Sequence, residues 1–265
     1  MTSFPPPQRQ PVDFTKIEDD VALVTINRPD ARNAVTAELA NALEEIVADI
    51  EARADIRVAI ITGAGGKAFC SGADLHQVAA GGLDAMFTAT AGFAGFVHNK
   101  RVKPWIAAVD GFALAGGFEI MLACDLAVAT ERSKFGLPEV SRGLIASAGG
   151  VYRLPRSIPK CVAMEMIATG RTMDAERAFS VGLINRLVPT EALFDTTMEL
   201  ARAIVANAPL AVQESVAIAR LSDDYTDAEL RRLGDEAQQR LQQSADYVEG
   251  AVAFTEKRAP RWTGR

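Results

Sequence analysis

The sequence KPWIAAVDGFALAGGFE, residues 103–119, carries the strongest prediction of the core of the fold. Within it, Trp105 to Val109 is a short, continuously apolar run with the length of a buried strand. The glycine pair Gly116-Gly117 then stands where a strand would turn into a helix, and Glu119 falls in the first turn of that helix. The stretch therefore predicts a buried strand, a tight glycine turn and a helix that begins with a carboxylate.

Apolar residues continue beyond this stretch, so that Gly111 to Ala129 has the length and composition of a candidate membrane span. The glycine pair, Glu119 and Asp125 argue against one, because a charge in an apolar run is unfavourable unless it has a partner or a function. We expect a buried turn, helix and strand instead, with the strand over Leu126 to Ala129.

Alternating elements precede this region. Val21 to Asn27 and Arg57 to Gly63 are β-branched runs typical of strands, and apolar residues recur at helical spacing between them. Thr36 is expected to cap the N-terminus of that helix. These elements make a β-α-β unit, and the sequence as a whole predicts an α/β fold.

From Pro159 onward the pattern is helical almost throughout. A narrow apolar stripe in this region needs a partner surface, on the main body or on a neighbouring subunit, and consists of Leu230, Leu233, Ala237 and Leu241. We predict three regions: a disordered N-terminal extension over 1–12, a core over 13–198 and a helical C-terminal region over 199–265. The boundary near residue 198 rests on composition alone.

Composition limits the classes of function. The chain has 265 residues, of which 49% are hydrophobic, enough for one large globular domain. A net charge of −6 gives no general attraction to nucleic acid or to an anionic membrane, so we expect neither as a partner. The N-terminus has no apolar stretch after a basic start, and the cysteines are odd in number and widely spaced. We expect reduced thiols in the cytoplasm, without disulfides or a zinc site.

Several known site motifs are incomplete. The loop from Thr62 follows a strand as a nucleotide-binding loop does, but Ala68 stands where the third glycine of G-x-G-x-x-G belongs. Ala68 also lacks the hydroxyl of a phosphate-binding P-loop, and Ile145 replaces the first glycine of a serine-hydrolase elbow. The two histidines, His76 and His98, have neither metal-ligand spacing nor cysteine neighbours, so no metal site is expected.

Two short segments, Phe69 to Leu75 and Ala113 to Glu119, could present backbone amides instead. Small residues follow a strand in the first, and in the second the glycine pair precedes a helix, so N–H groups are accessible at both turns. Two such amides can form an oxyanion hole, in which each donor typically contributes about 3 kcal/mol. On spacing alone, simple tight turns are the more common explanation of both segments.

Two carboxylates accompany these turns. Glu119 follows the glycines, and Glu139 follows the rigid sequence Phe135-Gly-Leu-Pro. Either glutamate could be a structural cap of a helix or a loop. Burial would raise both pKa values and a close pair would split them, which leaves one carboxyl protonated and the other able to activate water near neutral pH.

Longer motifs surround these residues. Residues 103–119 occur together with Ala68-Phe-Cys-Ser-Gly-Ala-Asp-Leu, with Phe135-Gly-Leu-Pro-Glu and with Ala148-Gly-Gly-Val-Tyr-Arg-Leu-Pro. A C-terminal motif, Glu249-Gly-x-x-Ala-Phe-x-Glu-Lys-Arg-x-Pro-x-Trp, completes the set. With these motifs the chain closely resembles the crotonase (enoyl-CoA hydratase/isomerase) family over all but its first dozen residues.

The resemblance implies a spiral of β-β-α repeats with a helical C-terminal region that mediates trimerisation, as a homotrimer or as a hexamer made from two trimers. It implies an oxyanion hole formed by the amides of Ala73 and Gly116. Family members that hydrate enoyl thioesters have glutamates at the positions of both Glu119 and Glu139, whereas members confined to isomerisation commonly keep only the second. By this resemblance Glu119 activates the water and Glu139 protonates the α-carbon, without a metal or redox cofactor.

The CoA thioester would then be a substrate rather than a cofactor. The positions that resemble CoA-binding residues of the family are Arg28, Ala31, Arg32, Asp74, Leu75, His76, Gly117, Phe254 and Lys257. Phe254 and Lys257 resemble residues that close over the nucleotide from the same or a neighbouring subunit. An ordinary solvated surface role is the alternative for the peripheral positions.

Within the family, the combination of Gly-Gly-Phe-Glu, Leu-Pro-Glu and Ala-Phe-Thr-Glu-Lys-Arg resembles the carnitinyl-CoA dehydratase (crotonobetainyl-CoA hydratase) branch. Two segments depart from common hydratase motifs: Ala115 stands where a third glycine is common, and Ala146-Ser147 where Pro-Gly is common. We predict reversible hydration of a trans-2-enoyl-CoA to a 3-hydroxyacyl-CoA. The alternatives are carnitinyl-CoA dehydration, Δ3,Δ2-enoyl-CoA isomerisation by Glu139 alone, and acyl-CoA binding without catalysis.

Overall fold

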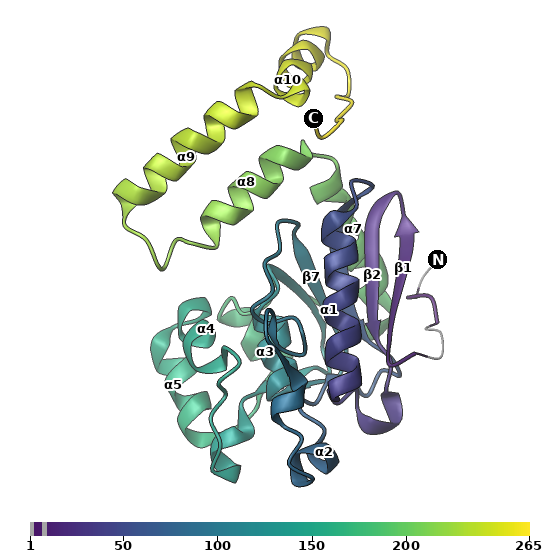
Figure 1. Cartoon of the computed structure of the whole chain (residues 1–265), viewed down its shortest axis with the longest axis vertical. Helices are drawn as coiled ribbons and strands as arrows, with labels where there is room; N and C mark the ends of the chain where they lie inside the picture. Colours follow the sequence, from purple (N-terminus) through teal and green to yellow (C-terminus); the bar gives the residue numbers. More distant parts are fainter. Residues whose placement is uncertain (1–2, 7–9) are drawn as a thin grey trace.

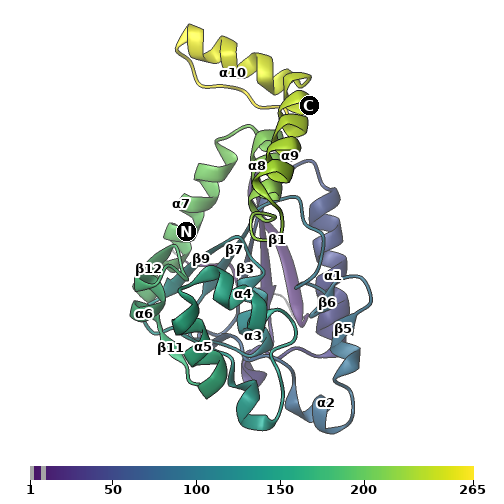
Figure 2. The same cartoon turned by 90° about the vertical axis from the view of Figure 1, so that its left-hand side faces the viewer.

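The computed structural model describes residues 3–6 and 10–265 of the chain. These residues form an α/β body and a group of C-terminal helices that extends away from it (Figure 1). Figure 2 shows the same division from the side, with the C-terminal helices above the body. The arrangement confirms the α/β fold and the helical C-terminal region predicted from the sequence.

A six-stranded sheet forms the centre of the body. Its first two strands, β1 (Val12–Glu18) and β2 (Asp20–Ile26), are antiparallel, and the strands after β2 are parallel. In spatial order these are β3 (Ile56–Gly63), β7 (Trp105–Val109), β9 (Leu126–Thr130) and β12 (Arg186–Val188). All residues of β7 are buried, as expected for a central parallel strand covered by helices on both faces.

Helices cover the two faces of this sheet. α1 (Ala37–Ala52) packs on one face and α7 (Leu193–Val205) on the other, and alternate residues of β2 divide between them. Val24 belongs to the core beneath α1, and Leu23 to the core beneath α7. Thr36 caps α1 as predicted, because its hydroxyl oxygen accepts a hydrogen bond from the Leu39 amide at 3.2 Å.

A second sheet contains four very short strands. In spatial order they are β11 (Met173–Asp174), β10 (Lys134–Gly136), β8 (Phe112–Leu114) and β4 (Ala68–Cys70). Along the chain, a long strand is followed by a short strand and then by a helical segment: β3–β4–α2 (Leu75–Ala79), β7–β8–α3 (Gly116–Leu122) and β9–β10–η3 (Pro138–Arg142). These repeated β-β-α units confirm the predicted spiral.

The apolar run from Gly111 to Ala129 forms β8, α3 and most of β9, as predicted. In the part of the chain that the structure describes, every helix is too short or too polar to cross a membrane. The three cysteines are free. Further elements are β5 (Phe87–Thr88), β6 (Gly92–Phe93), α4 (Gly150–Ser157), α5 (Lys160–Thr169) and α6 (Ala175–Ser180).

The C-terminal helices are α8 (Pro209–Ala219), α9 (Asp227–Gln242) and α10 (Ala245–Glu256). The apolar stripe predicted on α9 is only partly covered within one chain, since Ala237 is buried whereas Leu230, Leu233 and Leu241 are half-buried. The boundary predicted at residue 198 lies inside α7, which packs on the sheet. The helices that leave the body therefore begin with α8.

The disordered extension predicted over residues 1–12 falls partly on 1–2 and 7–9, which lie outside the described residues. Within the described ones, the Phe4 ring packs edge-on against Phe194 of α7, with ring centroids 5.0 Å apart. Val12 is fully buried and begins β1. The N-terminal segment thus contacts the body at both of these points.

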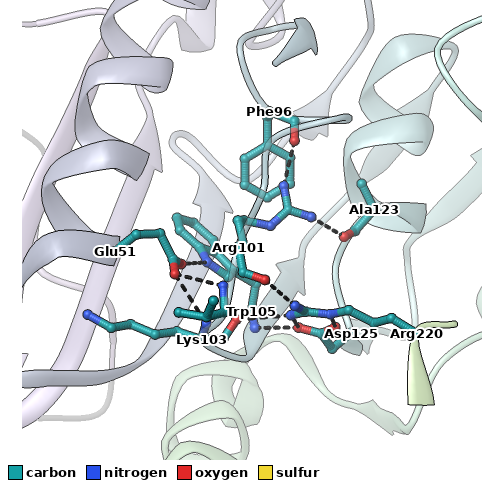
Figure 3. Close-up of polar contacts among 9 residues, drawn as sticks. Glu51, Phe96, Arg101, Lys103, Trp105, Ala123, Asp125 and Arg220 are labelled. Carbon is teal, nitrogen blue, oxygen red and sulfur yellow. Dashed lines mark hydrogen bonds and ion pairs between the residues drawn. The ribbon is translucent and has the colours of Figure 1, made fainter. Parts of the chain in front are cut away.

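A polar cluster ties the C-terminal helices to the body (Figure 3). Arg220, which follows α8, forms a two-pronged ion pair with Asp125: Nε donates to Oδ1 at 2.7 Å and Nη2 donates to Oδ2 at 2.8 Å. The Asp125 carboxylate also accepts a hydrogen bond from the Trp105 amide at 2.7 Å. One carboxylate therefore joins the end of α8 to the first residue of β7 and to the start of β9.

The cluster continues to the ends of two helices (Figure 3). Arg101 donates to the carbonyl of Ala123, the C-cap of α3, and its guanidinium carbon lies 4.0 Å from the Phe96 ring centroid. Glu51, near the end of α1, accepts a hydrogen bond from the Trp105 indole at 3.0 Å. A cation near a helix C-terminus is favourable, so Arg101 stabilises the end of α3.

We expect Asp125→Ala to lower the free energy of unfolding by about 1–3 kcal/mol, because it removes the carboxylate that accepts from Arg220 Nε and from the Trp105 amide. Urea denaturation followed by circular dichroism, at a fixed protein concentration, measures the change. The control is Glu236→Ala, which breaks an exposed ion pair with Arg232 on α9 and should change stability by less than about 1 kcal/mol. Equal effects of the two variants would show that the cluster is worth no more than a surface pair.

Candidate active site

Three neighbouring short strands carry the candidate residues. β4, β8 and β10 run parallel to one another, with β8 between the other two. The carboxyl ends of parallel strands meet at one edge of a sheet, so the residues that follow the three strands are brought together. Ala73 follows β4, Gly116 follows β8 and Glu139 follows β10.

The turns after β4 and β8 are in direct contact. A β-carbon added to Gly72 would lie 2.8 Å from that of Ala115 and 3.0 Å from the Gly116 nitrogen. One added to Gly117, a candidate CoA-binding residue, would lie 2.1 Å from the Cys70 carbonyl oxygen. Side chains at these positions would separate the two turns, so glycine is required for the close approach of the two backbone segments.

The two candidate oxyanion amides point out of the elements that carry them. Ala73 forms a parallel bridge with Val35, in which the Val35 amide donates to the Gly72 carbonyl and the Val35 carbonyl accepts from the Asp74 amide, both at 2.8 Å. Successive amides of extended backbone alternate in direction, so the Ala73 N–H points away from this bridge. Gly116 is the first residue of α3, and the first amides of a helix have no acceptor within it.

The residue before α3 has an unusual backbone. Ala115 has φ 51° and ψ −131°, a conformation that glycine tolerates and alanine rarely adopts. Its amide donates to the Gly136 carbonyl at 2.9 Å, and its carbonyl accepts from the amides of Phe118 and Glu119. These bonds hold the strained residue in place and make the turn that presents Gly116 rigid.

Glu119 lies in the first turn of α3 and is only 3% exposed. Its Oε1 atom accepts a hydrogen bond from the Gly150 amide at 2.8 Å. Burial raises the pKa of the Glu119 carboxyl to about 7, the Gly150 amide opposes this shift, and the charge of Glu139 adds to it. Near neutral pH the carboxyl is therefore able both to accept and to release a proton.

Glu139 lies in the helical turn after β10 and is half-buried. Burial raises the pKa of this carboxyl as well. Its Oε2 atom is buried and has no hydrogen-bond partner among the described residues. A buried carboxyl oxygen without a donor favours the protonated form. The structure thus brings together two carboxyls that interact and that both bind protons more tightly than in water.

Residues predicted to bind CoA surround the turn after β2. Arg28, Ala31 and Arg32 belong to or flank the short helix Pro29–Ala31, and the Arg32 carbonyl accepts from the Ser71 amide at 3.1 Å. This bond brings the turn next to the segment that follows β4. The structure therefore places these three residues close to the first candidate oxyanion turn.

Asp74, Leu75 and His76 lie at the start of α2. Asp74 forms an ion pair with Arg28 at 3.0 Å and caps α2 by accepting from the His76 amide. Burial works to raise the pKa of Asp74, but the hydrogen bonds from Arg28 and His76 hold it below its usual value. Leu75 and His76 are exposed, whereas Asp74 is engaged in structure within the chain.

Phe254 and Lys257 lie at the end of α10, which is at the opposite end of the molecule from α2 in both views (Figures 1 and 2). Phe254 is 86% exposed. The structure does not bring these two residues to the other candidates within one chain. An exposed phenylalanine on a helix that extends from the body remains without an intramolecular role.

The two histidines are not arranged as metal ligands. His76 lies in α2, and the His98 Nε2 atom lies 2.8 Å from the Tyr152 hydroxyl. Across residues 3–6 and 10–265, the structure contains no group of three or more His, Cys, Asp or Glu side chains that could hold a metal ion.

A spiral of β-β-α units, with two contacting backbone turns at one sheet edge, is the arrangement of the crotonase class of proteins. The chain belongs to the enoyl-CoA hydratase/isomerase family, whose model matches residues 16–265. The family resemblance predicted from the motifs is confirmed by this match.

Individual relatives are similar over almost their whole lengths. The chain is 39% identical to a carnitinyl-CoA dehydratase of Citrobacter koseri and 40% identical to one of Proteus mirabilis, covering 91% of this chain and 94% of each relative. Among solved structures, an enoyl-CoA hydratase from Mycobacterium tuberculosis has a TM-score of 0.91 and 42% identity, covering 96% of this chain and 99% of that one. A carnitinyl-CoA hydratase from Mycobacterium avium has a TM-score of 0.75 at 42% identity, covering 97% and 100%.

Sequence reasoning did not assign a role to three residues that organise the site. The Gly150 amide supports Glu119, and Arg153 donates to the carbonyl of Ala148 beside it. The Asn33 side chain joins the turns after β2 and β3, because its Oδ1 accepts from the Arg28 amide and its Nδ2 donates to the Ala64 carbonyl. Gly150 and Arg153 occur in the motif Ala148-Gly-Gly-Val-Tyr-Arg-Leu-Pro that was recognised. Their partners are distant in sequence or are backbone atoms, so no side-chain pattern could have identified them.

We expect Glu119→Gln to stabilise the protein at pH 8 by up to about 3 kcal/mol relative to wild type. The folded-state pKa of Glu119, about 7, lies above the ordinary glutamate value of 4.5, so between these values the folded state binds more protons and stability falls as pH rises. Below pH 4.5 the contribution vanishes. Urea denaturation at pH 5 and pH 8 measures the difference.

The control for this measurement is Glu45→Gln on the exposed side of α1, which should change stability by no more than about 0.5 kcal/mol at either pH. A wild-type protein that matches Glu119→Gln in stability at pH 8 would contradict the raised pKa.

Proposed function

We propose that this chain catalyses the reversible addition of water to the double bond of a trans-2-enoyl-CoA thioester, which yields a 3-hydroxyacyl-CoA. The observation that carries the proposal is the pair of interacting carboxyls, Glu119 buried and Glu139 half-buried, beside two outward-pointing backbone amides. Burial raises the pKa of both carboxyls, and the charge of Glu139 raises that of Glu119 further. Near neutral pH, Glu119 can then act as a base and Glu139 as an acid.

In the hydration direction, ionised Glu119 takes a proton from water while the water oxygen bonds to the β-carbon. The electron pair of the double bond moves onto the thioester, and the amides of Ala73 and Gly116 stabilise the enolate oxygen. The carboxylic acid of Glu139 then delivers its proton to the α-carbon. Glu119 ends protonated and Glu139 ionised, and proton exchange with solvent restores the starting state. CoA is part of the substrate, because it forms the thioester that is hydrated. The proposed reaction contains no redox step.

Two further functions differ in how they use the same groups. Dehydration of carnitinyl-CoA is the same reaction in reverse on a substrate with a quaternary ammonium group, and the relatives from Citrobacter koseri and Proteus mirabilis bear that name. Shifting a double bond without water needs only a carboxyl near the α-carbon and would leave Glu119 without a role. Support of Glu119 by the Gly150 amide favours the reactions that use water.

We also propose that the nucleotide part of CoA lies beside Arg28, Arg32 and His76, where the turn after β2 meets the start of α2. Phe254 and Lys257 would then reach it from a neighbouring subunit, since α10 extends away from its own body (Figure 1). The half-covered stripe on α9 supports self-association of the C-terminal helices, as trimers or pairs of trimers. A cytoplasmic location fits the free thiols.

We expect Glu119→Gln and Glu139→Gln each to lower kcat for hydration of crotonyl-CoA by about 10²–10⁴-fold, because each removes one proton-transfer group. Loss of the absorbance of the conjugated thioester measures the rate. Glu45→Gln is the matched control and should retain wild-type turnover. Wild-type rates in either active-site variant would contradict the assigned roles.

The same variants separate the alternatives. Full isomerisation of a 3-enoyl-CoA by Glu119→Gln would support an isomerase that uses Glu139 alone. Tight CoA-thioester binding by calorimetry, without turnover of any thioester in a panel of chain lengths, would support a non-catalytic binder. A preference for crotonobetainyl-CoA over crotonyl-CoA would support the carnitinyl-CoA branch.

We expect kcat/KM of the wild-type enzyme to rise as the pH increases through about 7, since Glu119 must lose its proton before it can act as the base. A pH series of initial rates with crotonyl-CoA measures this limb. Residual activity of Glu119→Gln should lack the limb. A wild-type rate already constant from pH 5 upward would show that another group is the base.

A further inference from the structure

Arg153 lies in the first turn of α4, and its guanidinium joins two segments that are far apart in the sequence. Nη1 donates to the Ala148 carbonyl at 3.1 Å, and Nη2 donates to the Val97 carbonyl at 2.6 Å. Arg153 is half-buried, so both bonds are partly shielded from water. A guanidinium carries its donors in a fixed planar arrangement and can hold two acceptors at once.

On one side, Arg153 holds the turn that supports Glu119. Gly149 has φ 127°, and a β-carbon added to it would lie 2.2 Å from Arg153 Nη1, so the guanidinium packs directly on the glycine. The next residue is Gly150, whose amide donates to Glu119 Oε1 at 2.8 Å. The direction of this N–H depends on the turn that Arg153 contacts at Ala148 and Gly149.

On the other side, Arg153 holds the turn behind the candidate oxyanion amide. The Val97 amide donates to the Phe93 carbonyl at 3.2 Å, so Val97 and Phe93 belong to one turn. A β-carbon added to Gly116 would lie 2.3 Å from the Phe93 ring, which therefore packs against the Gly116 backbone. A shift of the Val97 carbonyl would be transmitted through this turn to Gly116.

The guanidinium also acts on Glu119 through its charge. Among the described residues, two charged side chains influence the Glu119 carboxyl, Glu139 from the turn after β10 and Arg153 from α4. Burial is the largest influence and raises the pKa of Glu119, the charge of Glu139 raises it further, and the charge of Arg153 lowers it. Removing that charge would make Glu119 harder to ionise.

We propose that Arg153 is a positioning residue that fixes the water-activating carboxylate and the oxyanion amide relative to each other by bridging the carbonyls of Ala148 and Val97. The proposal rests on the function proposed above and deepens it. Arg153 contacts the supports of both groups and not the reacting atoms, so its removal should weaken the chemical step more than it weakens substrate binding.

Two substitutions separate its charge from its bridging geometry. Arg153→Met removes both, whereas Arg153→Lys keeps the charge on a single ammonium that cannot span both carbonyls with a planar fork. Arg156→Met is the matched control, because it removes the same charge from the same helix at an exposed side chain that pairs with Asp224. All three are compared with wild type in kcat, KM and pH profile for crotonyl-CoA hydration.

For Arg153→Met we expect kcat to fall at least about tenfold, KM to stay within about twofold, and the acid limb of the pH profile to move to higher pH. Arg153→Lys should keep the loss in kcat and return the acid limb to its wild-type position. Arg156→Met should match wild type in both. Circular dichroism verifies folding, and Arg153→Lys alone tests the bridging if Arg153→Met does not fold.

A readout that needs no turnover separates this proposal from the proposed function. In protein labelled with ¹³C at the glutamate carboxyl carbons, the resonance that disappears in Glu119→Gln reports the titration of Glu119. Arg153→Met should move this titration to higher pH, even if wild type hydrates no thioester tested. The inference is overturned by an unmoved titration in Arg153→Met, by wild-type kcat in Arg153→Lys, or by Arg156→Met producing the same changes.

Discussion

The burial of the Glu119 carboxyl is the constraint on which the rest of the site depends. A carboxylate removed from water is strongly disfavoured unless other donors replace the water, and the Gly150 amide is one such donor. Compensation is only partial, because the pKa remains at about 7. If donors replaced all of the lost water, the carboxylate would be too weak a base. If they replaced none of it, the carboxyl would stay protonated. Partial compensation therefore suits proton transfer near neutral pH, at the expense of stability above that range.

The spiral supplies this environment through its second sheet. Neighbouring parallel strands β4, β8 and β10 deliver three turns to one edge, and close contact at Gly72 and Gly117 brings the first two turns together. The strained backbone of Ala115 persists because hydrogen bonds on both sides hold it. The long strands of the first sheet, buried between α1 and α7, provide the stability against which such strain is tolerated. The first sheet thus provides stability, and the second sheet carries the candidate site.

The sequence predicted the elements with strong periodicity and missed those without it. The long strands, the Thr36 cap and the buried segment from Gly111 to Ala129 follow from local pattern and are present. Strands of two or three residues have too few side chains to show a period, so the second sheet came only from family resemblance. The boundary predicted at residue 198 falls inside α7, which packs on the first sheet. The sequence of an amphipathic helix does not show which surface its apolar face will contact. Contacts through backbone carbonyls, such as those of Arg153, leave no side-chain pattern at all.

Both glutamates had a structural alternative, as caps of a helix or a loop, and their contacts argue against it. A capping side chain accepts from an amide two or three residues ahead, as Thr36 does from Leu39. Glu119 instead accepts from Gly150, 31 residues along the chain and in another helix. The buried Oε2 of Glu139 has no donor among the described residues. Glu119 thus does not cap its own helix, and the raised pKa of both carboxyls lowers stability where they are ionised. This cost fits the proposed proton transfer, which needs carboxyls with such pKa values.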